Sequence, residues 1–217
     1  MNPQALDVMS LAAHVSDYLG QACTDVELVA DRRGSRVFRV RLSTGDVALK
    51  RASPNTENQG VREHLARREA AVLIHLHEFV PGYLLVSGDL PNNGGSWLAL
   101  CWLDGVTPYR LFTSARRGDD SPARRDSIRH TAAAIADRLA ALHSRGWRHA
   151  DLQPAHILLG ANSVHLIDFA LAQGSDPLLA DLPYRGGMVH FTAPETAACL
   201  LATPDDQSIA FENVPRS

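Results

Sequence analysis

A polar loop and the two short apolar runs that follow it decide the fold of this chain. The loop and the first run read HADLQPAHILL at residues 149–159, and the second run reads VHLIDF at residues 164–169. A turn of residues 160–163 separates the two runs, so they predict a β-hairpin. Asp151 and Asp168 stand on either side of this hairpin. Their joint placement favours a shared function over two ordinary turn aspartates.

A long helix is predicted ahead of this loop. Ser121 and Pro122 supply an N-cap and a first-turn proline. The apolar residues of its expected core face are Ile128, Ile135, Leu139 and Leu142. After the hairpin the chain is rich in loop residues, with one short helix expected at 195–202.

The N-terminal part of the chain predicts a five-stranded sheet with helices. The expected elements are a helix at 1–20, three strands within 25–51, a helix at 57–78, and strands around 83–86 and 97–102. The apolar stripe of the second helix also includes Glu69. The mixture of hairpin strands and separate helices predicts an α+β fold.

Composition excludes several classes of protein. The formal charge is −3 at pH 7, which argues against a nucleic-acid partner because such domains are normally basic. Cys23, Cys101 and Cys199 lack zinc-site spacing and are expected to be reduced, as in the cytoplasm. No basic cluster precedes an apolar run at the N-terminus, and no apolar run is long enough for a bilayer. We therefore expect neither a signal peptide nor a membrane span.

Lysine usage singles out one residue. Of the 21 basic residues, Lys50 is the only lysine. A GC-rich genome accounts for arginine elsewhere, but a site that needs a compact ammonium cannot accept a planar guanidinium. Glu69 is the expected partner of Lys50, because a carboxylate on a core-facing stripe is costly unless it is paired. The alternatives are a solvated Lys50 and a surface-exposed Glu69.

Four segments, taken in order, resemble motifs of the protein-kinase-like superfamily. VALK at residues 47–50 resembles the strand of the phosphate-binding lysine, and residues 149–159 resemble the catalytic loop. LIDFA at 166–170 resembles the metal-binding segment, and APE at 193–195 resembles the end of an activation segment. Each motif alone is weak, but four in the right order over roughly residues 25–195 are specific.

The resemblance implies a two-lobed α+β fold with ATP bound between the lobes. Residues 1–103 would form the N-lobe, a five-stranded antiparallel sheet plus one helix. Residues 104–217 would form a mainly helical C-lobe. Only 22 residues follow Glu195, so this lobe would be incomplete, and apolar positions such as Ile128 and Leu139 would be partly exposed. A partner protein or a second copy is then expected to cover them, unless the C-terminal tail folds back and suffices.

The resemblance also implies the chemistry, which is transfer of the γ-phosphate of ATP to a hydroxyl with Mg²⁺ or Mn²⁺. Lys50 would hold the phosphates, Glu69 would anchor Lys50, and Asp151 would orient or deprotonate the attacking hydroxyl. Asp168 and His156 would bind the metal. The implied ATP-binding residues are Gly34, Val37, Ala48, Lys50, Cys101, Leu103 and Leu158, although each adenine contact could equally be plain core.

The chain departs from the kinase pattern at four places. Its phosphate-covering loop has one glycine, Gly34; Ala150 replaces an arginine, Gln153 replaces a lysine, and His156 replaces the metal-binding asparagine. His156 followed by IDFALAQ at residues 167–173 resembles the Kdo/heptose type of lipopolysaccharide kinase. The alternative role for His156 is a hydrogen bond that braces the loop.

A looser resemblance concerns the phosphate acceptor. The chain is similar to kinase-like proteins of lanthipeptide- and thioamitide-type peptide biosynthesis. This likeness favours Ser or Thr of a precursor peptide as acceptor, with a sugar or small molecule next. The competing hypothesis is a pseudokinase that binds nucleotide or peptide and scaffolds a partner enzyme.

Overall fold

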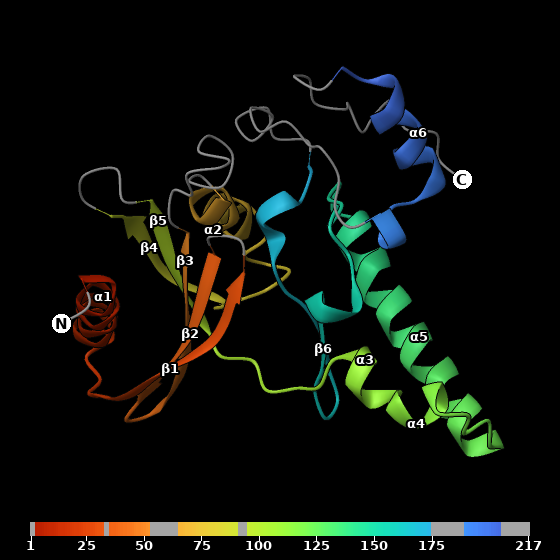
Figure 1. Ribbon diagram of the computed structural model, residues 1–217, viewed down its shortest axis with the longest axis horizontal. Helices are drawn as coiled ribbons and strands as arrows, with labels where there is room; N and C mark the ends of the chain where they lie inside the picture. The colour runs from red at the N-terminus through yellow and green to blue at the C-terminus, as the bar shows by residue number, and fades with distance from the viewer. Residues whose placement is uncertain (1–2, 33–34, 53–64, 91–94, 175–188, 205–217) are drawn as a thin grey trace. The chain divides into compact units, whose positions relative to one another are not determined.

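The computed structural model describes residues 3–32, 35–52, 65–90, 95–174 and 189–204 of the 217-residue chain. The chain divides into two units, residues 1–102 and 103–217. A five-stranded antiparallel sheet and several helices confirm the predicted α+β class (Figure 1). Each unit has its own secondary structure and its own packing.

The first unit contains the sheet. Its elements are α1 (Pro3–Leu19), β1 (Cys23–Arg32), β2 (Ser35–Leu42), β3 (Gly45–Ala52), α2 (Leu65–His75), β4 (Leu84–Asp89) and β5 (Ser96–Cys101). The strand order is β1-β2-β3-β5-β4, and every neighbouring pair is antiparallel. All five predicted strands are therefore present. The first part of the second predicted helix, residues 57–64, lies outside the described residues, as does Gly34.

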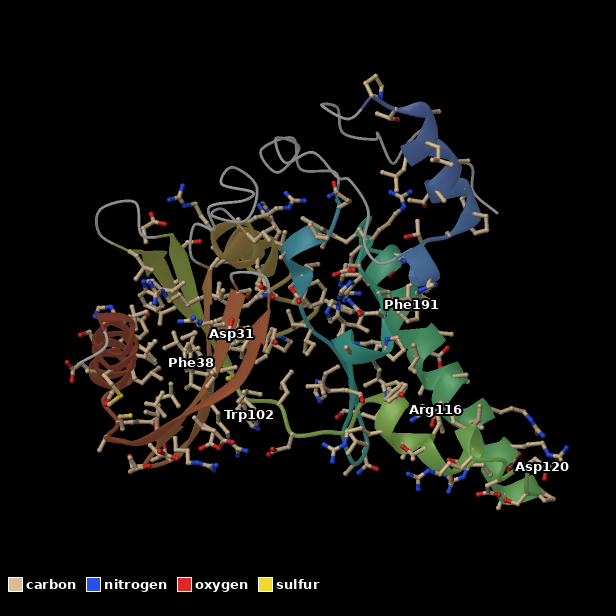
Figure 2. All side chains as sticks on the ribbon, viewed as in Figure 1. Asp31, Phe38, Trp102, Arg116, Asp120 and Phe191 are labelled. Carbon is tan, nitrogen blue, oxygen red and sulfur yellow. The ribbon has the colours of Figure 1, made fainter. Side chains whose placement is uncertain are left out.

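The two faces of this sheet are packed differently. One face carries buried apolar side chains that form a core with α1; its members include Val8, Leu11, Ala12, Val15, Phe38, Val40, Val47, Leu49 and Ala99. Figure 2 shows Phe38 on the side of the sheet that α1 covers. On the other face, α2 packs against β3, β4 and β5. Val37, Ala48 and Lys50 lie on this second face and are only half-buried.

The second unit is built around one long helix and a small hairpin. Its helices are α3 (Pro108–Leu111), α4 (Thr113–Arg116), α5 (Pro122–His143) and α6 (Pro194–Ala202). Its strands are β6 (Ile157–Leu159) and β7 (Val164–Leu166), and 3₁₀ turns lie at Pro154–His156, Phe169–Leu171 and Val189–Phe191. As predicted, Ser121 caps α5: its Oγ accepts a hydrogen bond from the backbone N–H of Arg124 at 3.3 Å.

The hairpin is present with shorter strands than the apolar runs predict. Ile157 pairs with Leu166 and Leu159 pairs with Val164. The second strand ends at Leu166 because Asp168 adopts a left-handed backbone conformation, with φ 65° and ψ 65°. This turn carries the carboxylate of Asp168 out of the strand.

Helix α5 is mostly uncovered. Of its 22 residues only Leu142 is buried, whereas Ile128, Ile135 and Leu139 of the predicted core face are half-buried. Among the described residues, none of the helices combines the length and the apolar character needed to cross a membrane.

Candidate active site

The predicted site residues fall into two groups, one in each unit. The first group surrounds Lys50, on the half-buried face of the sheet. The second group surrounds His156, next to the hairpin. Each group is built by the packing and hydrogen bonds of its own unit.

Lys50 and Glu69 form a buried ion pair. Lys50 Nζ lies 2.6 Å from Glu69 Oε2, and the two side chains are 12% and 1% exposed. Strand β3 places Lys50 on the face that α2 covers, and the apolar stripe of α2 carries Glu69 into the same interface. A short charge-assisted hydrogen bond of this kind offsets the desolvation of both groups. The pair holds the Lys50 ammonium in one position beside an open patch of sheet.

The open patch beside Lys50 is formed by cross-strand neighbours. Val37 is the partner of Lys50, and Arg39 is the partner of Ala48. Cross-strand partners present their side chains on the same face of the sheet. Val37, Ala48 and Lys50 therefore share one half-buried face of the sheet, on which Ala48 contributes only a small side chain.

Sequence reasoning missed a cluster at the end of this patch. The Arg39 guanidinium lies 4.4 Å from the ring centroid of Trp102 and forms an ion pair with Asp46. The backbone N–H of Trp102 donates to the Asp46 carbonyl oxygen at 3.2 Å. Strand alternation could have placed Arg39 on the face of Val37, but its stacking on Trp102 depends on the register between three strands.

The backbone at residues 101–103 has two of its donors occupied. The N–H of Cys101 donates to the Tyr83 carbonyl oxygen at 2.8 Å, and Trp102 donates to Asp46. No acceptor for the Leu103 N–H is found among the described residues. The Cys101 thiol donates to the Gly82 carbonyl oxygen at 3.0 Å, and burial raises its pKa. Cys101 is therefore a neutral side chain at physiological pH, and within the described residues the Leu103 N–H remains without an acceptor.

In the second unit, His156 contacts both predicted aspartates. Its Nδ1 donates to the backbone carbonyl oxygen of Asp151 at 2.7 Å, which assigns the proton to that nitrogen. Its Nε2 lies 3.2 Å from Gln153 Nε2 and 3.4 Å from Asp168 Oδ2. One ring nitrogen therefore braces the loop, and the other lies between the Gln153 amide and the Asp168 carboxylate. The two roles considered for His156 are compatible in this geometry.

Strained backbone surrounds this cluster. Ala150 and Asp168 are the non-glycine residues with positive φ in the described part of the chain, at 61° and 65°. Each such residue costs about 1–2 kcal/mol, and strain of this kind is common at functional sites. His149 holds the two segments together: it is 2% exposed, its Nε2 donates to the Ile167 carbonyl oxygen at 2.9 Å, and its ring lies 5.0 Å from that of Phe169. Through these two contacts His149 braces the loop against residues 167–169.

Asp168 and His156 are the residues that could hold a divalent cation. A carboxylate oxygen and an imidazole nitrogen are ligand types that divalent cations accept, and here the two atoms lie 3.4 Å apart. Mg²⁺ usually takes few protein ligands and completes its shell with water and substrate oxygens. The described residues contain no group of three or more His, Cys, Asp or Glu side chains arranged to hold a metal. Asp151 lies close by, with its Oδ2 3.5 Å from His156 Nδ1.

One protein-family model matches the part of the chain that contains most of the candidate site residues. Residues 64–177 match the model of the lipopolysaccharide kinase (Kdo/WaaP) family. The matched segment contains Glu69, Asp151, His156 and Asp168, whereas Lys50 lies just before it.

Curated proteins with similar segments are bacterial protein kinases. A probable serine/threonine-protein kinase PkwA of Thermomonospora curvata is 31% identical over 86 residues, which is 40% of this chain and 11% of that protein. Serine/threonine-protein kinase AfsK of Streptomyces coelicolor is 31% identical over 108 residues, and AfsK of Streptomyces griseus is 27% identical over 108 residues. Both AfsK matches cover 49% of this chain and 13% of the relative. The similarity therefore concerns a small part of these much longer proteins.

Proposed function

This chain belongs to the lipopolysaccharide kinase (Kdo/WaaP) family, and on that premise we propose that it transfers the γ-phosphate of ATP to a hydroxyl group. The observation that carries the proposal is the ion pair between Lys50 and Glu69 at 2.6 Å. A buried pair with the lysine beside an open patch suits a phosphate-binding ammonium. We also propose that residues 1–103 and 104–217 are the two kinase lobes.

Lys50 would neutralise charge on the α- and β-phosphates, and Glu69 would keep its ammonium in place. Val37, Ala48 and Leu158 would each contact the adenine. The Leu103 N–H and the Cys101 carbonyl oxygen would hydrogen-bond the adenine edge, and Gly34 would approach the phosphates. Positioning and charge neutralisation are the main demands of phosphoryl transfer.

In the second unit, Asp151 would accept a hydrogen bond from the attacking hydroxyl and take its proton. Its side chain is 19% exposed, so the carboxylate is not fully buried. Asp168 and His156 would hold Mg²⁺ or Mn²⁺, which supplies positive charge to the transferring phosphate when bound. His156 Nδ1 would keep the Asp151 loop in place through its hydrogen bond to the Asp151 carbonyl oxygen.

Two classes of acceptor are supported. The similar segments of AfsK and PkwA belong to serine/threonine-protein kinases, which favours Ser or Thr of a peptide, in our proposal a precursor peptide of natural-product biosynthesis. The family description names lipopolysaccharide, which supports a sugar hydroxyl as the second candidate. The direct test is transfer from γ-³²P-ATP to a Ser/Thr peptide library and to a lipopolysaccharide core oligosaccharide. Label in the peptide supports the first candidate, and label in the sugar replaces it with the second.

The alternative is a pseudokinase that binds nucleotide or peptide and scaffolds a partner enzyme. The departures from the kinase motif support it, because Gln153 Nε2 lies 3.2 Å from the nitrogen that would face the metal. ATP binding measured by calorimetry, taken together with the transfer assay, separates the two hypotheses. Binding without transfer to any acceptor would favour the pseudokinase, and absence of nucleotide binding would contradict both the kinase and its nucleotide-binding alternative.

We also propose that a partner protein or a second copy covers α5, and that the protein acts in the cytoplasm. The exposure of α5 supports the first statement, since only Leu142 is buried along the helix. The three free cysteines support the second. Light scattering combined with limited proteolysis tests the cover of α5. A protease-resistant monomer that turns over ATP by itself would contradict it.

A further inference from the structure

Arginine is concentrated at one end of the second unit. Residues 110–129 contain six of the 20 arginines of the chain. We call them the arginine surface: Arg110, Arg116, Arg117, Arg124, Arg125 and Arg129. They lie on α3, on α4 and the residue after it, and on the first two turns of α5. Three aspartates in the same stretch leave a formal charge of 6 − 3 = +3, whereas the whole chain carries −3.

Half of this surface is already neutralised or stacked. Arg124 pairs with Asp119 at 3.3 Å, and Arg129 pairs with Asp126 at 3.1 Å. The Arg116 guanidinium lies 3.7 Å from the centroid of the Tyr109 ring. Tyr109 is 62% exposed, so the stacked pair stands at the surface. Figure 2 labels Arg116 and Asp120 where α4 and the start of α5 lie.

The other half has no partner. Arg110, Arg117 and Arg125 are exposed, and in the described part of the chain their guanidinium groups form no ion pair or hydrogen bond. Arg125 and Arg129 line an open hollow of about 500 Å³ together with Pro122, Ala123 and Asp126. The surface therefore offers three unpaired guanidinium groups, one of which, that of Arg125, lines the hollow. A planar guanidinium suits carboxylates because it can donate two parallel hydrogen bonds to them.

We propose that the arginine surface binds an acidic peptide segment of the acceptor. This inference rests on the proposed function, because it assumes that the acceptor is a peptide. The surface contains none of the residues assigned to nucleotide binding or phosphoryl transfer. It would therefore act as a docking site that raises the local concentration of the acceptor hydroxyl.

The charges favour a peptide over other anionic partners. A nucleic-acid-binding domain is normally basic as a whole, but this chain is acidic overall. An anionic membrane would face Asp119, Asp120 and Asp126 together with the arginines, and the face of Tyr109 is already covered by Arg116. A short flexible chain can place its carboxylates on the unpaired arginines and avoid the aspartates.

The test measures docking separately from phosphoryl transfer. The probe is a fluorescein-labelled peptide of alternating Glu and Gly, compared with the same peptide of Gln and Gly, by fluorescence anisotropy on the full chain. The variant is Arg110→Gln/Arg117→Gln/Arg125→Gln. The control is Arg36→Gln/Arg41→Gln/Arg67→Gln, which removes the same charge from the first unit. ATP binding is measured for all three proteins.

The Glu peptide should bind the wild type and the control with similar affinity, and the triple variant at least tenfold more weakly. Raising the salt from about 50 mM to about 500 mM should weaken wild-type binding, because exposed charges are screened. Unchanged ATP binding in the triple variant would separate docking from the nucleotide site.

Equal binding of the Glu peptide by the triple variant and wild type would overturn the inference, as would binding lost equally in the control. Binding to phosphatidylglycerol vesicles that depends on these arginines, without peptide binding, would replace the peptide with a membrane.

Discussion

The two units hold their candidate functional groups in different ways. In the first unit, Lys50 and Glu69 are 12% and 1% exposed within a sheet that is covered by α1 on one face and α2 on the other. In the second unit, the side chains of Asp151, His156 and Asp168 are 14–36% exposed, and the long helix beside them buries only Leu142. Packing positions the first group, whereas strained backbone and hydrogen bonds position the second.

Because of this difference, we expect mutations in the two units to change activity and stability differently. Removing a charge from a packed ion pair should damage both activity and folding, because the remaining charge is left buried. Removing a group held by a strained backbone should damage activity while relieving strain. The predictions below test this contrast, from the largest expected effect to the smallest.

Lys50→Ala should lower phosphoryl transfer by about 10²–10³-fold or more, by analogy with loss of one preorganised charge-stabilising group. It should also lower the free energy of unfolding by about 3 kcal/mol, because Glu69 remains buried without its partner. Lys50→Arg should be inactive too, since a guanidinium is larger than the ammonium. Transfer assays and urea unfolding measure the two effects.

The matched control is Lys50→Met/Glu69→Leu. It should recover most of the lost stability and none of the activity, because two apolar side chains fill the space of the ion pair. Full activity in any Lys50 variant would remove this residue from the mechanism.

Asp168→Gly should show the opposite behaviour in the second unit. Transfer should fall by at least about 10²-fold, while the unfolding free energy should stay level or rise by about 1 kcal/mol, because glycine adopts φ 65° without strain. Ala150→Gly is the control for strain alone and should gain similar stability with much of its activity retained. Marked destabilisation of both variants, seen in thermal unfolding, would contradict the contrast between the units.

Arg39→Gln should weaken ATP binding about 2–5-fold with little change in the maximal rate, since a partly exposed cation–π contact contributes about 0.5–1 kcal/mol. The loss of stacking would free Trp102, the neighbour of the adenine-edge backbone. Arg41→Gln is the matched control, because Arg41 lies on the same face of β2 and pairs with Asp25, Glu27 and, at 3.9 Å, Asp46, whereas the stacking on Trp102 belongs to Arg39. Calorimetry with ATP should therefore separate the two variants, and equal affinities would contradict this role of Arg39.

The smallest effect should come from His165 in β7. Burial lowers the pKa of His165, and the neighbouring charge of Arg138 lowers it further. Its folded-state pKa is thus below its unfolded value of about 6.5, so stability is retained above that pH and is lost as the pH falls from there towards the folded pKa. His165→Gln should show a smaller decrease in unfolding free energy between pH 7.5 and pH 5.5 than the wild type. Identical pH dependence would exclude His165 as the cause.

Local patterns were enough to predict most elements of the first unit. Strand alternation identified β1 to β5, and the stripe of α2 indicated that Glu69 faces the core. The four-residue helices α3 and α4 were missed, because they are too short to show a helical period. On α5 the helical periodicity placed Ile128 and Leu139 on one apolar side, and both are half-buried. The periodicity could not show how completely that side is covered, because this depends on other segments.

What the sequence by itself determined is the fold class, the family motifs and the identity of the candidate groups, since these follow from residue types at local spacings. Only the tertiary structure decided how the groups meet. The left-handed backbone at Ala150 and Asp168 has no sequence signal, because non-glycine residues rarely adopt it. The stacking of Arg39 on Trp102 depends on strand register. The two contacts of His156, at 2.7 Å to the Asp151 carbonyl oxygen and 3.4 Å to Asp168, depend on how the loop folds against the hairpin. Such contacts join residues distant in sequence, and the whole packed unit determines their geometry.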